Sequence, residues 1–199
     1  MLLYNSSISG NCYKVRLLLA HLGVDYERRD VDVIDRSDRR EFLGDLNPAR
    51  RVPTVVLDDG RALAESNAIL WYFGEGTRFV PGDRYERAKV LQWMFFEQYE
   101  HEPAIAVARF LKTYYGQPDV WESQREQLTK HGIKALRMLE DGLQDRDWLA
   151  GGAMTIADIA LYAYTHAAGE GGFSLDEQPA IRAWLDRVAA QPGHVTMAD

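Results

Sequence analysis

Cysteine is almost absent from the sequence, because Cys12 is the only one among 199 residues. A lone cysteine excludes an internal disulfide framework and suits a reducing cytoplasm. No run of about 18 apolar residues occurs, so we expect no transmembrane helix. The opening residues MLLYN lack a basic region and predict no secretory signal. Together these absences predict a cytoplasmic protein.

Metal-binding patterns and an excess of positive charge are also missing. The five histidines never stand at the spacing of metal ligands, so we expect no metal site. The 30 acidic side chains outnumber the 23 basic ones, and the net charge of −7 favours neither nucleic acid nor an anionic membrane as a partner. Apolar residues make up 46% of the chain, as in ordinary globular proteins, and its length allows one or two domains with a real core.

The first 76 residues alternate between strand and helix patterns. Apolar residues recur from Val15 to Leu22 at the spacing of one helix face, and Gly23 offers a stop. The dipeptide Asp59-Gly60 between two apolar runs indicates a β-hairpin, and a helix between the first two strands implies that they pair in parallel. The predicted order is β-α-β-α-β-β-α, with strands at 1–5, 26–33, 53–57 and 61–64, helices at 10–23 and 65–73, and one short helix within the charged segment 35–46.

The strand pattern ends before a linker at 77–84. Helical stretches follow at 84–114, 119–144, 155–168 and around 181–188, and Pro103 should kink the first of them. The sequence therefore predicts an α/β domain at 1–76 and an all-helical domain at 85–199.

The entrance of the first helix crowds small polar groups together, with Ser9, Asn11 and Cys12 within four residues. Unpaired N–H groups and the dipole at the amino end of a helix favour an anion such as a thiolate. A hydroxyl there can donate a hydrogen bond to a bound sulfur and so favour its ionised form. An equally simple interpretation is that Ser9 or Asn11 only caps the helix.

Two further motifs allow the same choice between a structural and a functional interpretation. Val52-Pro53 opens a strand, where a trans bond is the commoner form and a cis bond would turn the Val52 backbone toward a peptide-like ligand. Glu65-Ser66 opens a helix, where such residues serve as caps. In the functional interpretation Ser66 holds a ligand carboxylate and Glu65 holds an ammonium group, which suits the head of an α-amino acid.

The order and spacing of these motifs resemble the cytosolic glutathione transferase family over essentially the whole chain. The resemblance is carried by four patterns, Ser9-x-x-Cys12-x-Lys14-Val15-Arg16, Asn47-Pro48-x-x-x-Val52-Pro53-Thr54, Glu65-Ser66-x-Ala68-Ile69 and Thr155-Ile156-Ala157-Asp158. The last pattern looks like the family's buried capping box and is structural. The resemblance implies a thioredoxin-like domain followed by a helical-bundle domain, and a homodimer.

The helix entrance is most similar to serine-type branches of this family, including theta, zeta and nu. By this resemblance Ser9 is the catalytic residue that stabilises the thiolate of glutathione, and Asn11 shares this task or performs it alone. Tyrosine-type members suggest Tyr4 instead, which ranks below Ser9 because it falls within the predicted strand. Cys12 matches a cysteine that packs inside the first helical turn.

The resemblance also implies how glutathione, as co-substrate, is held. Val52 pairs through its backbone with the cysteinyl part, Pro53 is the cis residue, and Arg51 reaches the glycyl carboxylate. Glu65 and Ser66 hold the γ-glutamyl head. The thiolate then attacks a small electrophile, with no covalent enzyme intermediate.

The predicted helical domain supplies the wall for the electrophile, at residues 107–115, with Arg109 and Tyr114 as its polar candidates. Other glutathione-dependent reactions on this fold stay open, namely those of an isomerase, a dehalogenase and a disulfide reductase. A non-catalytic scaffold that binds a partner in a stress response is a further alternative. The intact glutathione motifs favour retained glutathione binding over such a scaffold.

Overall fold

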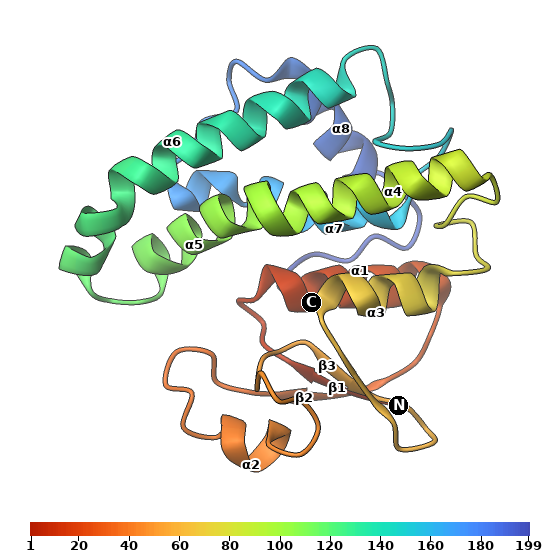
Figure 1. Cartoon of the computed structure of the whole chain (residues 1–199), viewed down its shortest axis with the longest axis vertical. Helices are drawn as coiled ribbons and strands as arrows, with labels where there is room; N and C mark the ends of the chain where they lie inside the picture. The colour runs from red at the N-terminus through yellow and green to blue at the C-terminus, as the bar shows by residue number, and fades with distance from the viewer. The chain divides into compact units, whose positions relative to one another are not determined.

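The computed structural model describes all 199 residues and divides them into two compact units (Figure 1). The first unit comprises Met1–Thr77 together with Pro192–Asp199, and the second comprises Arg78–Gln191. We expected residues 85–199 to form one helical domain, but residues 192–199 fold with the first unit instead. Side chains of the first helix donate hydrogen bonds to the backbone of this last segment, which explains the difference. No helix of the chain is both long and apolar enough to span a membrane.

Four strands form one mixed sheet in the first unit, in the order β2-β1-β3-β4. They are β1 (Leu2–Asn5), β2 (Glu27–Asp30), β3 (Thr54–Val56) and β4 (Ala62–Ala64). β1 pairs in parallel with β2 and antiparallel with β3, and β3 and β4 form the hairpin around Asp59-Gly60. The predicted parallel pairing of the first two strands and the predicted hairpin are confirmed. The strand expected at 26–33 is shorter in the structure, and β2 is an edge strand whose four residues are all exposed.

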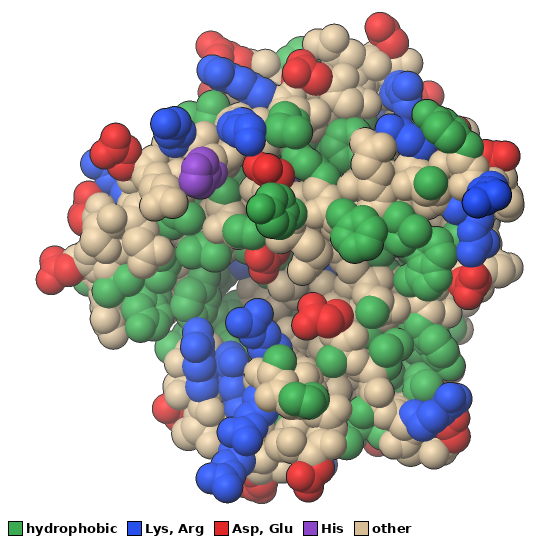
Figure 2. Space-filling view, in the orientation of Figure 1, with side chains coloured by type: hydrophobic (Ala, Val, Ile, Leu, Met, Phe, Trp, Pro, Cys, Tyr) green, Lys and Arg blue, Asp and Glu red, His purple; other side chains and the backbone are tan.

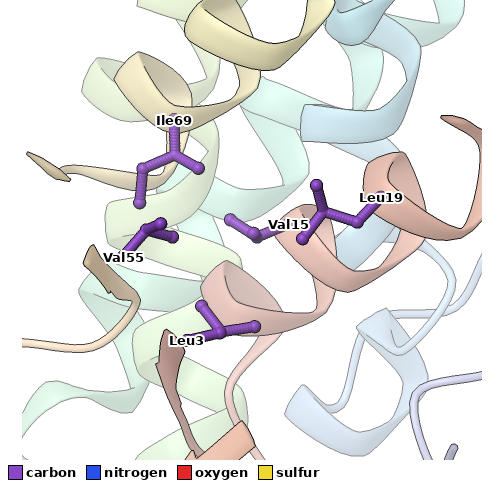
Figure 3. Close-up of a cluster of buried hydrophobic side chains, with 5 residues drawn as sticks. All are labelled: Leu3, Val15, Leu19, Val55 and Ile69. Atoms are coloured by element: carbon purple, nitrogen blue, oxygen red, sulfur yellow. The ribbon is translucent and has the colours of Figure 1, made fainter. Parts of the chain in front are cut away.

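Two helices pack together on one face of this sheet, α1 (Gly10–Leu22) and α3 (Ser66–Gly74) (Figure 1). Five side chains from the helices and the sheet point toward one another in Figure 3, namely Leu3, Val15, Leu19, Val55 and Ile69. None of them is more than 1% exposed. Val15 and Leu19 share a helix face because they are four residues apart. This cluster seats α1 on the sheet and thereby fixes where its amino end lies.

The opposite face of β1 packs toward α2 (Arg39–Leu43). Tyr4 forms a second buried cluster there with Val31 and Leu43. Successive residues of a strand point to opposite faces of the sheet, so Tyr4 faces away from the helices that Leu3 contacts. The hydroxyl of Tyr4 is therefore on the wrong face of the sheet to serve the entrance of α1.

The second unit is entirely helical. Its elements are α4 (Arg84–Phe96), the π-helical turn η1 (Glu97–His101), α5 (Glu102–Thr113), α6 (Pro118–Leu143), α7 (Ile156–Thr165), the short 3₁₀ turn η2 (Ala168–Gly171) and α8 (Pro179–Ala189). The irregularity expected at Pro103 lies just before it, in η1, and Pro103 itself sits in the first turn of α5. A proline has no N–H and crowds the carbonyl four residues earlier, which here belongs to Tyr99 within η1.

A capping box opens α7, the most deeply buried helix of this unit. The carboxylate of Asp158 accepts hydrogen bonds from the backbone and hydroxyl of Thr155 at 2.8 and 2.9 Å. Its other oxygen accepts from the Leu149 backbone and the Trp184 indole, both at 3.0 Å. The predicted structural role of Thr155 and Asp158 is confirmed.

Candidate functional site

Three segments of the first unit meet at one edge of the sheet. β1 ends at Asn5 and leads through a short loop into α1. Thr54, the first residue of β3, pairs with Tyr4 on one side and with Ala64 on the other. Pro53 therefore lies beside the end of β1, and the start of α3 follows directly after Ala64. This register gathers the motifs around residues 9, 52 and 65 at a single edge.

Ser9 is the N-cap of α1. Its backbone is extended, with φ −86° and ψ 117°, and its Oγ accepts a hydrogen bond of 3.3 Å from the Cys12 backbone N–H. Ser9 therefore does cap α1, as the structural interpretation of the motif predicts. This capping role does not compete with a functional one, because a hydroxyl that accepts a bond keeps a proton that it can donate to a ligand.

Cys12 is fully buried in the first turn of α1. Burial raises the pKa of its thiol to about 11, against the smaller lowering effects of the Ser9 hydrogen bond and of Arg16. A thiol with that pKa is un-ionised near neutral pH, and only the thiolate is a strong nucleophile. The expected packing role of Cys12 agrees with this environment.

The amino ends of α1 and α3 are joined by side chains. The Ser66 hydroxyl donates to Asn11 Oδ1 at 3.2 Å, and the Lys14 Nζ donates to the same hydroxyl at 3.4 Å. Ser66 is 4% exposed and Lys14 is completely buried. The sequence motifs assign no role to Lys14. Its position one turn after Asn11, on the same side of the helix, is the signal that points to it.

The peptide bond between Val52 and Pro53 is cis, as the family resemblance implies. Asn47 holds the preceding turn, because its side-chain nitrogen donates to the Arg51 carbonyl at 3.0 Å and to the Thr54 hydroxyl at 3.1 Å. The Thr54 hydroxyl donates to that carbonyl as well, at 2.8 Å. The ladder of β3 begins only at Thr54, so the backbone of Val52 lies outside the sheet's own pairing.

Two exposed charges flank this arrangement. Glu65 precedes α3 with a φ of 67°, which is unusual for a residue with a side chain, and makes no side-chain capping bond. Arg51 is exposed next to Val52, and its charge is close enough to Arg39 to lower that residue's pKa, after the larger effect of burial. In the space-filling view, Lys and Arg side chains gather over the α2 end of this unit (Figure 2). No contact within the chain ties Arg51 to Ser9 or Ser66 directly.

The polar candidates in the second unit are engaged with each other. Arg109 is 4% exposed and its Nε donates to Glu170 Oε2 at 2.8 Å. Arg109 also donates to the Tyr114 hydroxyl at 2.8 Å, and that hydroxyl donates to Glu170 at 3.3 Å. Burial raises the pKa of Tyr114, and Arg109 partly offsets this. The charge of Arg109 is thus largely balanced within the helical unit.

Comparisons with known proteins cover both units. The family profile "Glutathione S-transferase, N-terminal domain" matches residues 8–75, and "Glutathione S-transferase, C-terminal domain" matches residues 93–192. A glutathione S-transferase from Pseudomonas fluorescens, whose crystal structure is known, shares 47% sequence identity with this chain. The two structures superpose with a TM-score of 0.95, over 100% of this chain and 98% of that one.

Two curated relatives carry other activities in their names. A maleylacetoacetate isomerase from Pseudomonas aeruginosa is 30% identical over 96% of this chain and 92% of its own. A disulfide-bond oxidoreductase from Escherichia coli is 29% identical over 92% of this chain and 87% of its own. The similarities therefore extend over several reactions.

Proposed function

Because the chain belongs to the glutathione S-transferase family, we propose that it binds glutathione and adds the tripeptide's sulfur to a small electrophile. Ser9 stabilises the thiolate, and Asn11 assists it. The observation that carries this proposal is the Ser9 hydroxyl at the amino end of α1, on the sheet edge shared with the cis bond before Pro53 and with buried Ser66.

The same edge suits each part of the tripeptide. The Val52 backbone, free of the ladder, pairs with the cysteinyl residue as an added strand does. Ser66 and the amino end of α3 receive the γ-glutamyl carboxylate, which the buried ammonium of Lys14 behind the hydroxyl also favours. Glu65 binds the ammonium group of that head, and exposed Arg51 binds the glycyl carboxylate.

The energy needed to ionise the sulfur is modest. A free thiol has a pKa near 8.5, and lowering it by about two units requires about 2.7 kcal/mol of preferential thiolate stabilisation. One or two charge-assisted hydrogen bonds supply about that much, and the α1 dipole adds to them. The hydroxyl of Ser9 donates to the sulfur, which then attacks carbon without a covalent intermediate on the protein.

In our proposal the second unit contributes both the wall for the electrophile and a surface for dimerisation. Residues 107–115 form this wall, and the polar groups of the wall are Arg109 and Tyr114, which bond to each other and to Glu170. Hydrophobic side chains reach the surface over α4 (Figure 2), where Tyr85 and Phe95 are 68% and 69% exposed. Covering them in a homodimer accounts for this exposure.

Two alternatives come from the named relatives. A disulfide reductase needs a reactive sulfur, and buried Cys12, with a pKa of about 11, does not offer one. Such a reaction here would have to run through two glutathione molecules. An isomerase needs only the bound thiolate, so it shares the whole site and differs in the electrophile.

Calorimetric titration with glutathione, followed by conjugation of an aryl halide, tests the proposal. We expect binding in the millimolar range or tighter and measurable conjugation. Absence of binding would contradict the proposal and favour a non-catalytic scaffold. Binding with isomerase or disulfide-reductase activity, but without conjugation of any tested electrophile, would reassign the reaction and retain the site.

A further inference from the structure

The carboxyl-terminal strap, which we define as residues 192–199, is held through its backbone by side chains of α1. Tyr13 donates its hydroxyl proton to the Val195 carbonyl at 2.8 Å, and Arg16 Nη2 donates to the Met197 carbonyl at 2.7 Å. Tyr13 and Arg16 are buried, with 1% and 2% of their surfaces exposed. The strap therefore covers one side of the helix that carries the candidate site at its amino end.

Arg16 connects this strap to the sheet. Its Nη1 donates to Asn5 Oδ1 at 3.2 Å, while its buried Nε has no hydrogen-bond partner. The Asn5 side chain in turn donates to Asp30 at the end of β2, at 2.5 Å. One buried cation thus links the last residue of β1, the second turn of α1 and the strap.

This linkage bears directly on the loop before α1. The loop spans residues 6–9, so it begins right after Asn5 and ends at Ser9, the N-cap of α1. Arg16 holds Asn5 and stands two turns along the same stiff helix from Ser9. The guanidinium of Arg16 therefore helps to fix the position of both ends of the loop. The position of this guanidinium in turn depends on its bond to the strap.

We propose that Arg16 and Tyr13 are positioning residues, which use the strap to hold the amino end of α1 where Ser9 and Asn11 meet the sulfur of glutathione. The inference rests on the proposed function. It predicts that loosening the strap weakens ionisation of the bound sulfur more than it weakens binding of the tripeptide, because the γ-glutamyl contacts lie on α3.

The test measures the pKa of the bound glutathione thiol, from the ultraviolet absorbance of the thiolate against pH. Tyr13→Phe removes only a hydroxyl, Arg16→Gln removes the charge, and a stop after Gln191 removes the strap. Each variant should raise the pKa of the bound thiol by about one unit, which lowers kcat/KM about tenfold below that pKa. The glutathione Kd should change less than threefold, and Arg16→Lys should recover part of the shift.

Arg61→Gln is the matched control, because Arg61 is an exposed arginine of the same unit that pairs with Asp59 at 2.7 Å in the hairpin, away from the strap. It should leave the pKa of the bound thiol unchanged. Wild-type values in Tyr13→Phe and in the strap-free variant, both folded by circular dichroism, would overturn the inference and leave the proposed function standing. Absence of a bound thiolate in the wild type would overturn both.

Discussion

The hydroxyl of Ser66 donates a hydrogen bond of 3.2 Å to the side-chain oxygen of Asn11. Ser66 is the first residue of α3 and Asn11 is the second residue of α1, so this bond joins the amino ends of two helices. Both ends direct unpaired N–H groups and positive dipole charge toward the same edge of the sheet. A ligand with a carboxylate and a thiolate, as glutathione has, fits such a pair of ends.

Ser66→Ala should weaken glutathione binding. A hydrogen bond to a charged group contributes about 1.5–3 kcal/mol, so the Kd should rise about tenfold or more. Calorimetry measures this directly. Ser7→Ala makes the same change at an exposed serine of the loop before α1 and should leave the Kd for glutathione unchanged. Equal affinities in Ser66→Ala and the wild type would contradict the placement of the γ-glutamyl carboxylate.

Glu65→Gly should separate stability from binding. The φ of 67° and ψ of 113° at Glu65 are strained for a residue with a side chain, at a cost of about 1–3 kcal/mol. Glycine relieves the strain but loses about 0.5–1 kcal/mol through chain entropy. Urea unfolding should therefore show Glu65→Gly to be at least as stable as the wild type and more stable than Glu65→Ala.

Both Glu65 variants lose the carboxylate that we assign to the ligand's ammonium group, so both should bind glutathione more weakly. A Glu65→Gly protein that is less stable than Glu65→Ala would show that the backbone at this residue is not strained. Unchanged binding in either variant would remove Glu65 from the site.

Cys12 should make stability depend on alkaline pH. Its thiol ionises with a pKa of 9.0 when exposed in the unfolded chain but of about 11 in the folded protein. The unfolded state therefore loses this proton first, and the free energy of unfolding should fall by up to about 3 kcal/mol as the pH rises from 9 to 11. Urea unfolding of Cys12→Ala should lack this part of the decline. Identical slopes in the two proteins would contradict the burial-raised pKa of Cys12.

Asp158→Asn should destabilise the helical unit strongly. The carboxylate accepts four hydrogen bonds inside the protein, and an amide nitrogen in place of one oxygen would face two donors. Each buried donor left without a partner costs about 1–3 kcal/mol, so we expect a loss of about 3 kcal/mol or more. Thr155→Ser keeps the hydroxyl and should lose far less. Similar losses in the two variants would argue against this network as the cause.

Local sequence rules predicted much of the fold. Gly23 ends α1 with a φ of 64°, and Gly60 turns the hairpin with a φ of 82°, as their backbone freedom allows. The capping box at Thr155 was recognisable because its two partners are only three residues apart. Features with short sequence separation are therefore readable without a structure.

Long-range relationships were not readable in this way. Nothing near the carboxyl terminus shows that residues 192–199 pack on α1, because their bonds come from side chains about 180 positions earlier. Lys14 and Ser66 are 52 positions apart, so only the fold brings the lysine nitrogen to the serine hydroxyl. The cis bond at Val52-Pro53 was favoured only by the family resemblance, since a local sequence favours trans.

Ser9 is the residue that we propose stabilises the thiolate, and the pKa of the glutathione thiol bound to Ser9→Ala, compared with the wild type, tests this role most directly. Loss of the N-cap costs about 1 kcal/mol of stability, which a thermal melt would show to be tolerated. We predict a rise in the pKa of the bound thiol of about one to two units, toward its free value near 8.5. An unchanged pKa in Ser9→Ala, together with a raised one in Asn11→Ala, would contradict the claim that Ser9 stabilises the thiolate.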